Sequence, residues 1–143
     1  MTTITEDYVS FETAKLLKDK GFDEHCFCIN YPLPEGGHHS IILPNLLNNS
    51  MIPFTDEYKF CRYKEDFITI PTHQMAIKWL REVHNIFIDI CTLSPLAYTY
   101  RVCLISDTTG CLYEDYACEE GERFMSYEEA VEFALDYCLN NIL

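Results

Sequence analysis

The sequence predicts an α+β fold: a mainly antiparallel sheet of about five strands with three helices packed on it. Three observations lead to this prediction. Residues 69–91 have the pattern of a strand end, a capped helix and a following strand. Short segments of alternating apolar residues, typical of strands, lie on both sides of it. Capping signals mark two more helices, one near each end. A length of 143 residues suits one domain, so we expect residues 1–143 to form a single α+β domain.

The central helix is predicted over residues 72–84. Pro71 or Thr72 suits its start, and Asn85 suits its end because asparagine tolerates left-handed backbone. After Asn85 the apolar period changes to two residues, which indicates a strand over 86–91. We expect the core here, around the only tryptophan. The apolar stripe of the segment consists of Met75, Ala76, Trp79, Leu80, Val83 and Phe87.

The first helix is predicted over residues 11–20. Ser10 is a good N-cap residue, and Gly21 supplies a left-handed stop. Phe22 is then placed to fold back on Leu17 in a Schellman-type contact.

Further strands are predicted near residues 27–31, 58–70, 98–106 and 111–116. A polar turn interrupts the second of these, and a hairpin turn at residues 107–110 joins the last two. The segment 32–56 is the least regular. There we expect residues 41–43 to form a short strand or a flap, and the segment is a candidate binding loop because loops on a rigid scaffold commonly carry function.

The last helix is predicted over residues 127–140 and has the strongest cap. Ser126 and Glu129 form a capping box, and Met125 is placed to pack on Ala130. The predicted buried stripe consists of Tyr127, Ala130, Val131, Ala134, Leu135 and Cys138. The opposite side is wholly acidic and consists of Glu128, Glu129, Glu132 and Asp136.

The formal net charge is −13, and residues 107–143 carry −9 of it, with ten acids and one base. This negative charge repels the phosphate backbones of nucleic acids, so we expect no direct nucleic-acid binding. A basic protein partner is the natural complement of the acidic face Glu128, Glu129, Glu132 and Asp136. The alternative interpretation is a solvated face that serves solubility alone.

The eight cysteines follow no secretory signal, and no apolar run reaches the length of a membrane span. We therefore expect a cytosolic protein with reduced thiols that behave as small buried hydrophobes. The apolar surroundings of Cys91, Cys103, Cys111 and Cys138 favour this interpretation.

A metal site is the sharpest chemical alternative. Its candidate ligands are Cys26, Cys28, His38 and His39, with His25 and Cys61 nearby in the sequence. However, no second Cys or His pair with zinc-type spacing accompanies the first, which favours buried thiols and surface histidines. His84 is interpreted as a packed histidine at a helix end.

Four segments carry a resemblance to a known group: YVSFETAKLLKDKGF at 8–22, MAIKWLREVHNI at 75–86, SYEEA at 126–130 and YCLNNI at 137–142. With these motifs the chain is similar to a group of small, uncharacterised acidic proteins encoded by phages, prophages and mobile elements of gut anaerobes. The similarity spans nearly the full length except residues 32–66. It implies a small accessory protein in a bacterial host cytoplasm, and it brings no catalytic residue or cofactor.

These observations favour a non-enzymatic protein that binds a protein partner through the acidic face or the 32–56 loop, without a cofactor. A homo-oligomer is compatible with the same surfaces. The alternative is a small metal-binding protein or enzyme that uses the His/Cys group between residues 25 and 61.

Overall fold

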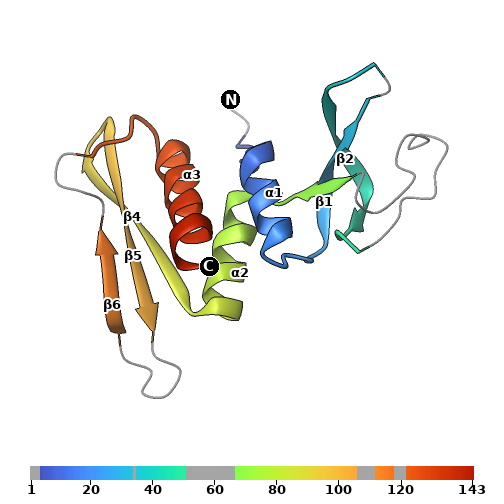
Figure 1. The fold of residues 1–143 in the computed structure, drawn as a ribbon. Coiled ribbons are helices and arrows are strands. Elements are labelled where there is room, and N and C mark those ends of the chain that lie inside the picture. The colour runs from blue at the N-terminus through green and yellow to red at the C-terminus, as the bar shows by residue number, and fades with distance from the viewer. Residues whose placement is uncertain (1–3, 34, 51–66, 106–111, 118–121) are drawn as a thin grey trace. The chain divides into compact units, whose positions relative to one another are not determined.

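The computed structural model describes residues 4–33, 35–50, 67–105, 112–117 and 122–143. These residues form three α-helices and six antiparallel strands, with helices packed against strands (Figure 1). The predicted α+β class is therefore confirmed. The strands form two three-stranded sheets, where the sequence analysis expected one sheet of about five strands.

The chain forms two compact units. Unit 1 consists of Met1–Asp7 and Thr72–Leu143, and unit 2 consists of Tyr8–Pro71. Each unit has one of the two sheets.

Unit 2 contains α1 (Phe11–Asp19), β1 (Cys26–Pro32), β2 (His38–Leu47) and β3 (Ile68–Ile70). Its strand order is β2-β1-β3, with both pairings antiparallel. The predicted short strand or flap at 41–43 lies inside the ten-residue strand β2, which extends further because it pairs with β1 along most of its length. The part of the predicted 58–70 strand before residue 67 lies outside the described residues.

The predicted ends of α1 are confirmed by backbone and side-chain hydrogen bonds. The Ser10 hydroxyl accepts from the Thr13 backbone N–H at 3.1 Å. Gly21 has φ +95°, a left-handed conformation that suits glycine. The Phe22 N–H donates to the Leu17 carbonyl at 2.9 Å, and both side chains are buried, as in a Schellman motif.

One core cluster of unit 2 consists of the buried Ile29, Leu43 and Phe67. Next to this core the buried Asn49 connects two segments. Its amide nitrogen donates to the Phe22 carbonyl at 2.7 Å. Its amide oxygen accepts from the backbone N–H of Thr69, in β3, at 3.0 Å. A polar side chain therefore fixes the chain that follows β2.

Unit 1 contains one sheet of order β4-β5-β6, with α2 and α3 in contact with each other and with the sheet (Figure 1). A tight turn at Pro95 and Leu96 joins β4 to β5. The elements in chain order are α2 (His73–His84), β4 (Ile86–Ser94), β5 (Ala97–Ile105), β6 (Leu112–Ala117), α3 (Tyr127–Tyr137) and the π-helical η3 (Cys138–Ile142).

Helix α2 begins and ends where the sequence predicts. The Thr72 hydroxyl accepts from the Met75 N–H at 3.2 Å, and Asn85 is left-handed with φ 55°. Trp79 is 6% exposed, which confirms its predicted place in the core. The predicted stripe is too wide, because Val83 is 57% exposed and Phe87 lies on β4, on the face opposite the buried Ile86.

Helix α3 has the predicted capping box, in which the Ser126 hydroxyl accepts from the Glu129 N–H at 3.1 Å. The Glu129 carboxylate accepts from the Met125 N–H, one residue before the cap. Met125 itself is 71% exposed, so the predicted packing of Met125 on Ala130 is wrong. The buried stripe is Ala130, Val131, Ala134, Leu135 and Cys138, without the exposed Tyr127. The helix changes from α to π after Tyr137.

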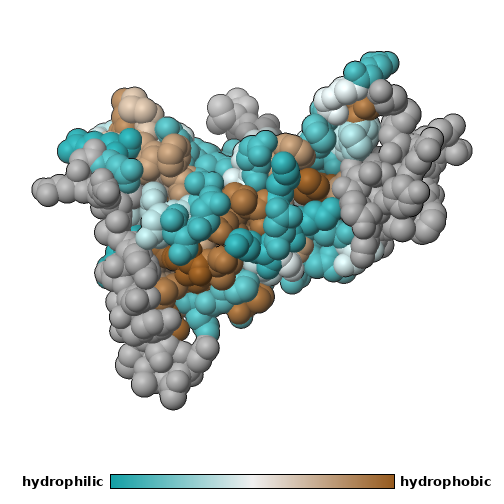
Figure 2. Space-filling view, in the orientation of Figure 1, coloured by the Kyte–Doolittle hydropathy of each residue, from teal (hydrophilic) through white to brown (hydrophobic). Residues whose placement is uncertain are grey.

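Exposed apolar side chains remain on unit 1, among them Val83, Leu96 and Phe133. On the face shown in Figure 2, brown, hydrophobic residues lie among teal, hydrophilic ones. Among the described residues, no helix is both long enough and apolar enough to cross a membrane.

Candidate functional site

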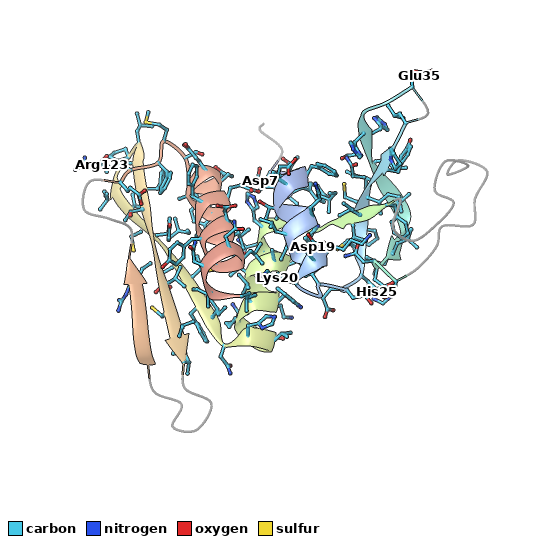
Figure 3. All side chains as sticks on the ribbon, viewed as in Figure 1. Asp7, Asp19, Lys20, His25, Glu35 and Arg123 are labelled. Carbon is cyan, nitrogen blue, oxygen red and sulfur yellow. The ribbon has the colours of Figure 1, made fainter. Side chains whose placement is uncertain are left out.

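A pocket of about 210 Å³ lies in unit 1 at the N-terminal ends of α2 and α3. Three chain segments line it. Residues 4–7 form one wall, His73 and Gln74 come from the first turn of α2, and Tyr127 and Glu128 come from the first turn of α3. Figure 3 labels Asp7, the last residue of the first wall. We refer to this site as the N-terminal pocket.

Local sequence signals position two of these walls, and one long-range hydrogen bond positions the third. The N-caps Thr72 and Ser126 fix the first turns of the two helices, so the residues directly after each cap reach the pocket. The His73 backbone N–H donates to the Asp7 carbonyl at 2.9 Å. This bond satisfies a helix N–H that has no intrahelical partner and holds residues 4–7 beside α2.

His73 and Glu132 form a polar pair behind the pocket. His73 Nε2 lies 2.9 Å from Glu132 Oε1, and His73 is 5% exposed. The Glu132 side chain is 25% exposed. Glu132 lies one helical turn after Glu128, so both carboxylates face the same side of α3. An ionised carboxylate can only accept, so Glu132 in that form accepts a hydrogen bond from His73 Nε2.

The pocket has many hydrogen-bond acceptors. Glu6, Asp7 and Glu128 are exposed and, within the described part of the chain, their carboxylates have no hydrogen-bond or ion-pair partner. The two helix N-termini carry only about half a positive charge each, less than the three full negative charges. The site therefore suits a ligand with several N–H donors and a positive charge.

The predicted acidic face Glu128, Glu129, Glu132 and Asp136 is not uniform. Glu129 caps its own helix, Glu132 bonds His73, and Asp136 accepts from the Asn140 amide at 2.9 Å. The prediction that Glu132 points outward with the others is wrong, because its pairing with His73 half-buries it. Glu128 remains available and lines the N-terminal pocket.

The predicted metal ligands Cys26, Cys28, His38 and His39 do not come together. His38 and His39 pair with Pro32 and Tyr31, at the opposite end of β1 from the two cysteines. Tyr31 is three residues beyond Cys28, about 10 Å at the rise of a strand, which is too far for one ion. No group of three or more His, Cys, Asp or Glu residues that would suit a metal occurs in the ranges the structure describes. Cys61, the more distant candidate, lies outside these ranges.

The thiols of β1 are protected by burial. Cys26 is 2% exposed and Cys28 is 5% exposed. Burial raises the pKa of Cys26 to about 12 and also raises the pKa of Cys28, because both environments disfavour the thiolate. Since the thiolate is the form that binds metal, the protonated thiols act as packing groups.

The remaining cysteines divide between buried and exposed positions. Cys103 and Cys138 are buried, as predicted. Cys91 is exposed, so the prediction of burial is wrong there, because β4 turns this residue to the same face as the exposed Phe87. Cys111 lies outside the described residues.

His84 is packed, as the sequence predicts. Its ring contacts Trp79 edge-on with 4.5 Å between centroids. Burial lowers the pKa of His84, because the charged form loses solvation. Nε2 is buried and has no hydrogen-bond partner within the described ranges.

The sequence does not predict a site role for Glu6, Asp7, His73 or Tyr127. Only the helix caps that precede His73 and Tyr127 are visible in the sequence. No family model matches the chain, and no curated protein or solved structure matches it.

Proposed function

We propose that the chain is a small non-enzymatic accessory protein that binds a basic protein partner at the N-terminal ends of α2 and α3. One observation carries the proposal. Three exposed carboxylates, those of Glu6, Asp7 and Glu128, come from separate parts of the chain and gather at one pocket without partners in the described structure. Charges of one sign at a concave site attract a partner of the opposite sign.

The resemblance to small acidic proteins of phages and mobile elements supports the biological setting of this proposal. It suggests a role in a bacterial host cytoplasm. A net charge of −13 favours fast association with such partners.

The other predicted surface, the 32–56 loop, receives less support from the described residues. Residues 38–47 form the strand β2, whose exposed side chains include His38 and His39 and the apolar Ile42 and Leu46. Of the described residues in this segment, only Glu35 is acidic. These side chains do not provide charge complementarity to a basic partner. The metal-binding or enzymatic alternative also loses support because its candidate ligands lie at opposite ends of β1.

A labelled lysine- and arginine-rich oligopeptide tests the proposal by fluorescence anisotropy. We expect saturable binding that weakens as salt rises, because exposed charges are screened. Charge reversal at Glu6, Asp7 and Glu128 together should weaken binding by about a hundredfold, since each lost charge-assisted contact costs about tenfold or less. A triple charge reversal on the exposed side of unit 2, at Glu12, Asp19 and Glu24, is the matched control. Equal loss in both triple variants would show only nonspecific charge attraction and would contradict the proposal.

A further inference from the structure

We propose that β4, the edge strand of unit 1, pairs antiparallel with β4 of a second copy of this chain, with Ile90 on the two-fold axis. The pairing joins two three-stranded sheets into one sheet that continues across both subunits. This inference goes beyond the proposed function, because it uses a different surface and a different partner. It is supported by the open backbone edge of β4, by the local charge and by the register.

The outer backbone edge of β4 is open. In the order β4-β5-β6, β4 lies at one end of the described sheet, beside β5. Among the described residues, no hydrogen bond, ion pair or ring contact from outside this ladder reaches residues 86–94. A row of N–H and C=O groups at the edge of a sheet is a template for a further strand. The shape of unit 1 therefore leaves room for one more strand beside β4.

β4 lacks the lysine, proline and mid-strand bulge that commonly protect a sheet edge. Its sequence contains neither lysine nor proline, and its pairing with β5 is regular from Ile86 to Thr92. The edge strand β2 of unit 2 differs in both respects. It contains Pro44, and its pairing with β1 is irregular between Ile42 and Leu47. Of these two long edge strands, β4 is the one suited to pair with another chain.

The local charge at β4 favours a second copy, although each chain carries a net charge of −13. Asp89 is the only charged residue of β4, and it lies opposite Arg101 of β5 in the register. These two charges cancel at the edge, whereas exposed acids gather at the N-terminal pocket. Two copies of like net charge therefore meet little repulsion at β4, and a basic partner finds no excess of acids there.

The directions of the backbone groups fix the register. The Ile105 N–H donates to the Asn85 carbonyl at 3.1 Å. Because these directions alternate along a strand, the odd-numbered residues 85–91 direct their N–H and C=O groups to β5, and the even-numbered residues 86–92 direct theirs outward. An axis at Ile90, the midpoint of Ile86–Ser94, pairs the outward groups along most of the strand. Each Asp89 then lies opposite the partner's Cys91, and the two aspartates do not face each other.

Sedimentation equilibrium of the full chain tests the pairing. We expect wild-type particles of twice 16.7 kDa. Thr92→Pro removes an outward N–H and should weaken association by about a hundredfold or more, because two symmetric hydrogen bonds are lost and their acceptors stay unpaired. The matched variant Thr92→Ala keeps the N–H and should remain dimeric. Circular dichroism checks that both variants fold, and if Thr92→Pro does not, a cysteine cross-link decides.

The cross-link tests the register with an almost unchanged backbone. In the proposed pairing, position 89 and the partner's Cys91 form a non-hydrogen-bonded pair with Cα atoms about 4.5 Å apart, within disulfide reach. Oxidised glutathione should therefore join two Asp89→Cys chains into a covalent dimer. Adding Cys91→Ser should abolish this product. The wild type should not form it through Cys91, because the two Cys91 side chains lie diagonally, about 7–8 Å apart.

The outcomes separate this inference from the proposed function. A wild-type chain that stays monomeric throughout a concentration series would overturn the β4 pairing, as would a dimer that a folded Thr92→Pro variant leaves intact. A cross-link that persists after Cys91→Ser, or no cross-link in Asp89→Cys, would overturn the pairing at Ile90. None of these results bears on the proposed function, which depends on oligopeptide binding at the N-terminal pocket.

Discussion

The two groups of candidate functional side chains, one in each unit, differ in their surroundings. In unit 2, Cys26 and Cys28 are buried and held as thiols, while His38 and His39 are exposed at the other end of the hairpin. In unit 1, Glu6, Asp7 and Glu128 are exposed around one pocket, and the buried His73 lies beside them. The first group is close in sequence and separated in space. The second is scattered in sequence and gathered in space.

This difference shows that side chains can bind a ligand only if they are both accessible and close together in space. Burial in unit 2 removes the thiolates that would bind a metal. In unit 1, residues that are distant in the sequence come together and form a pocket with many hydrogen-bond acceptors. The following predictions test this contrast, from the largest expected effect to the smallest.

The largest expected effect is on thiol reactivity. A pKa raised from 9.0 to about 12 lowers the thiolate fraction of Cys26 at pH 8 by roughly a thousandfold. We expect Cys26 to react with iodoacetamide much more slowly than the exposed Cys91, because burial both lowers the thiolate fraction of Cys26 and blocks the reagent. Mass spectrometry of the native protein measures the two rates. Comparable rates at the two cysteines would contradict the protected state of the β1 thiols.

Removal of the partner of His73 should have the next largest effect. Glu132→Ala leaves a buried imidazole nitrogen without its acceptor, which should lower the free energy of unfolding by about 1–3 kcal/mol. Urea denaturation measures the change. Glu132→Gln keeps an acceptor oxygen and should recover most of the loss. The control Glu82→Ala removes an exposed carboxylate of α2 and should change stability by about 0.5 kcal/mol or less. An equal effect of Glu132→Ala and Glu82→Ala would show that the His73 pair is dispensable.

Alkaline pH should destabilise the fold through its buried thiols. The pKa of Cys138, like that of Cys26, is raised by burial from 9.0 to about 12. Between these values the unfolded chain releases thiol protons that the folded chain retains, so stability is full below pH 9 and falls as pH rises towards 12. At pH 10 the loss is about 1 kcal/mol for each thiol.

The measurement is urea denaturation at pH 8 and pH 10, for the wild type and for Cys138→Ala. The variant starts with lower stability because it loses packing, but its decline between the two pH values should be smaller by about 1 kcal/mol. The same decline in variant and wild type would show that Cys138 does not contribute.

The smallest effects concern the helix caps, and they compare the two units directly. Ser10→Ala, Thr72→Ala and Ser126→Ala should each lower stability by about 1 kcal/mol, because each hydroxyl accepts from a backbone N–H of the first turn. Thr72→Ala and Ser126→Ala should also weaken binding of the basic oligopeptide, since these caps fix the walls of the N-terminal pocket. Ser10→Ala, in unit 2, should not. A binding loss with Ser10→Ala equal to the other two would contradict the assignment of the pocket.

The parts of the fold that the sequence predicts are those with local causes. Ser10, Thr72 and Ser126 begin helices because a hydroxyl reaches a backbone N–H three residues away, and Gly21 and Asn85 end helices because each tolerates a left-handed conformation. The grouping of strands into two sheets has no local cause, because alternation of apolar residues does not specify which strands pair.

The candidate site was only partly predictable for the same reason. Glu128 follows from the acidic pattern of the last helix. The pairing of His73 with Glu132 spans 59 positions, and the Asp7 carbonyl holds residues 4–7 at the pocket by accepting from the His73 backbone N–H. Periodicity also overstates burial, as Val83 and Cys91 show. Val83 lies in the last turn of α2, and Cys91 lies on the face of β4 that is exposed at Phe87 and Asp89 as well.

The most direct test of the account is an amide NMR map of the lysine- and arginine-rich oligopeptide on the full chain. The account predicts concentration-dependent shifts at Glu6, Asp7, Gln74 and Glu128, with residues 26–31 and 38–42 unchanged. Shifts concentrated on β1 and β2, with the N-terminal pocket unaffected, would contradict it.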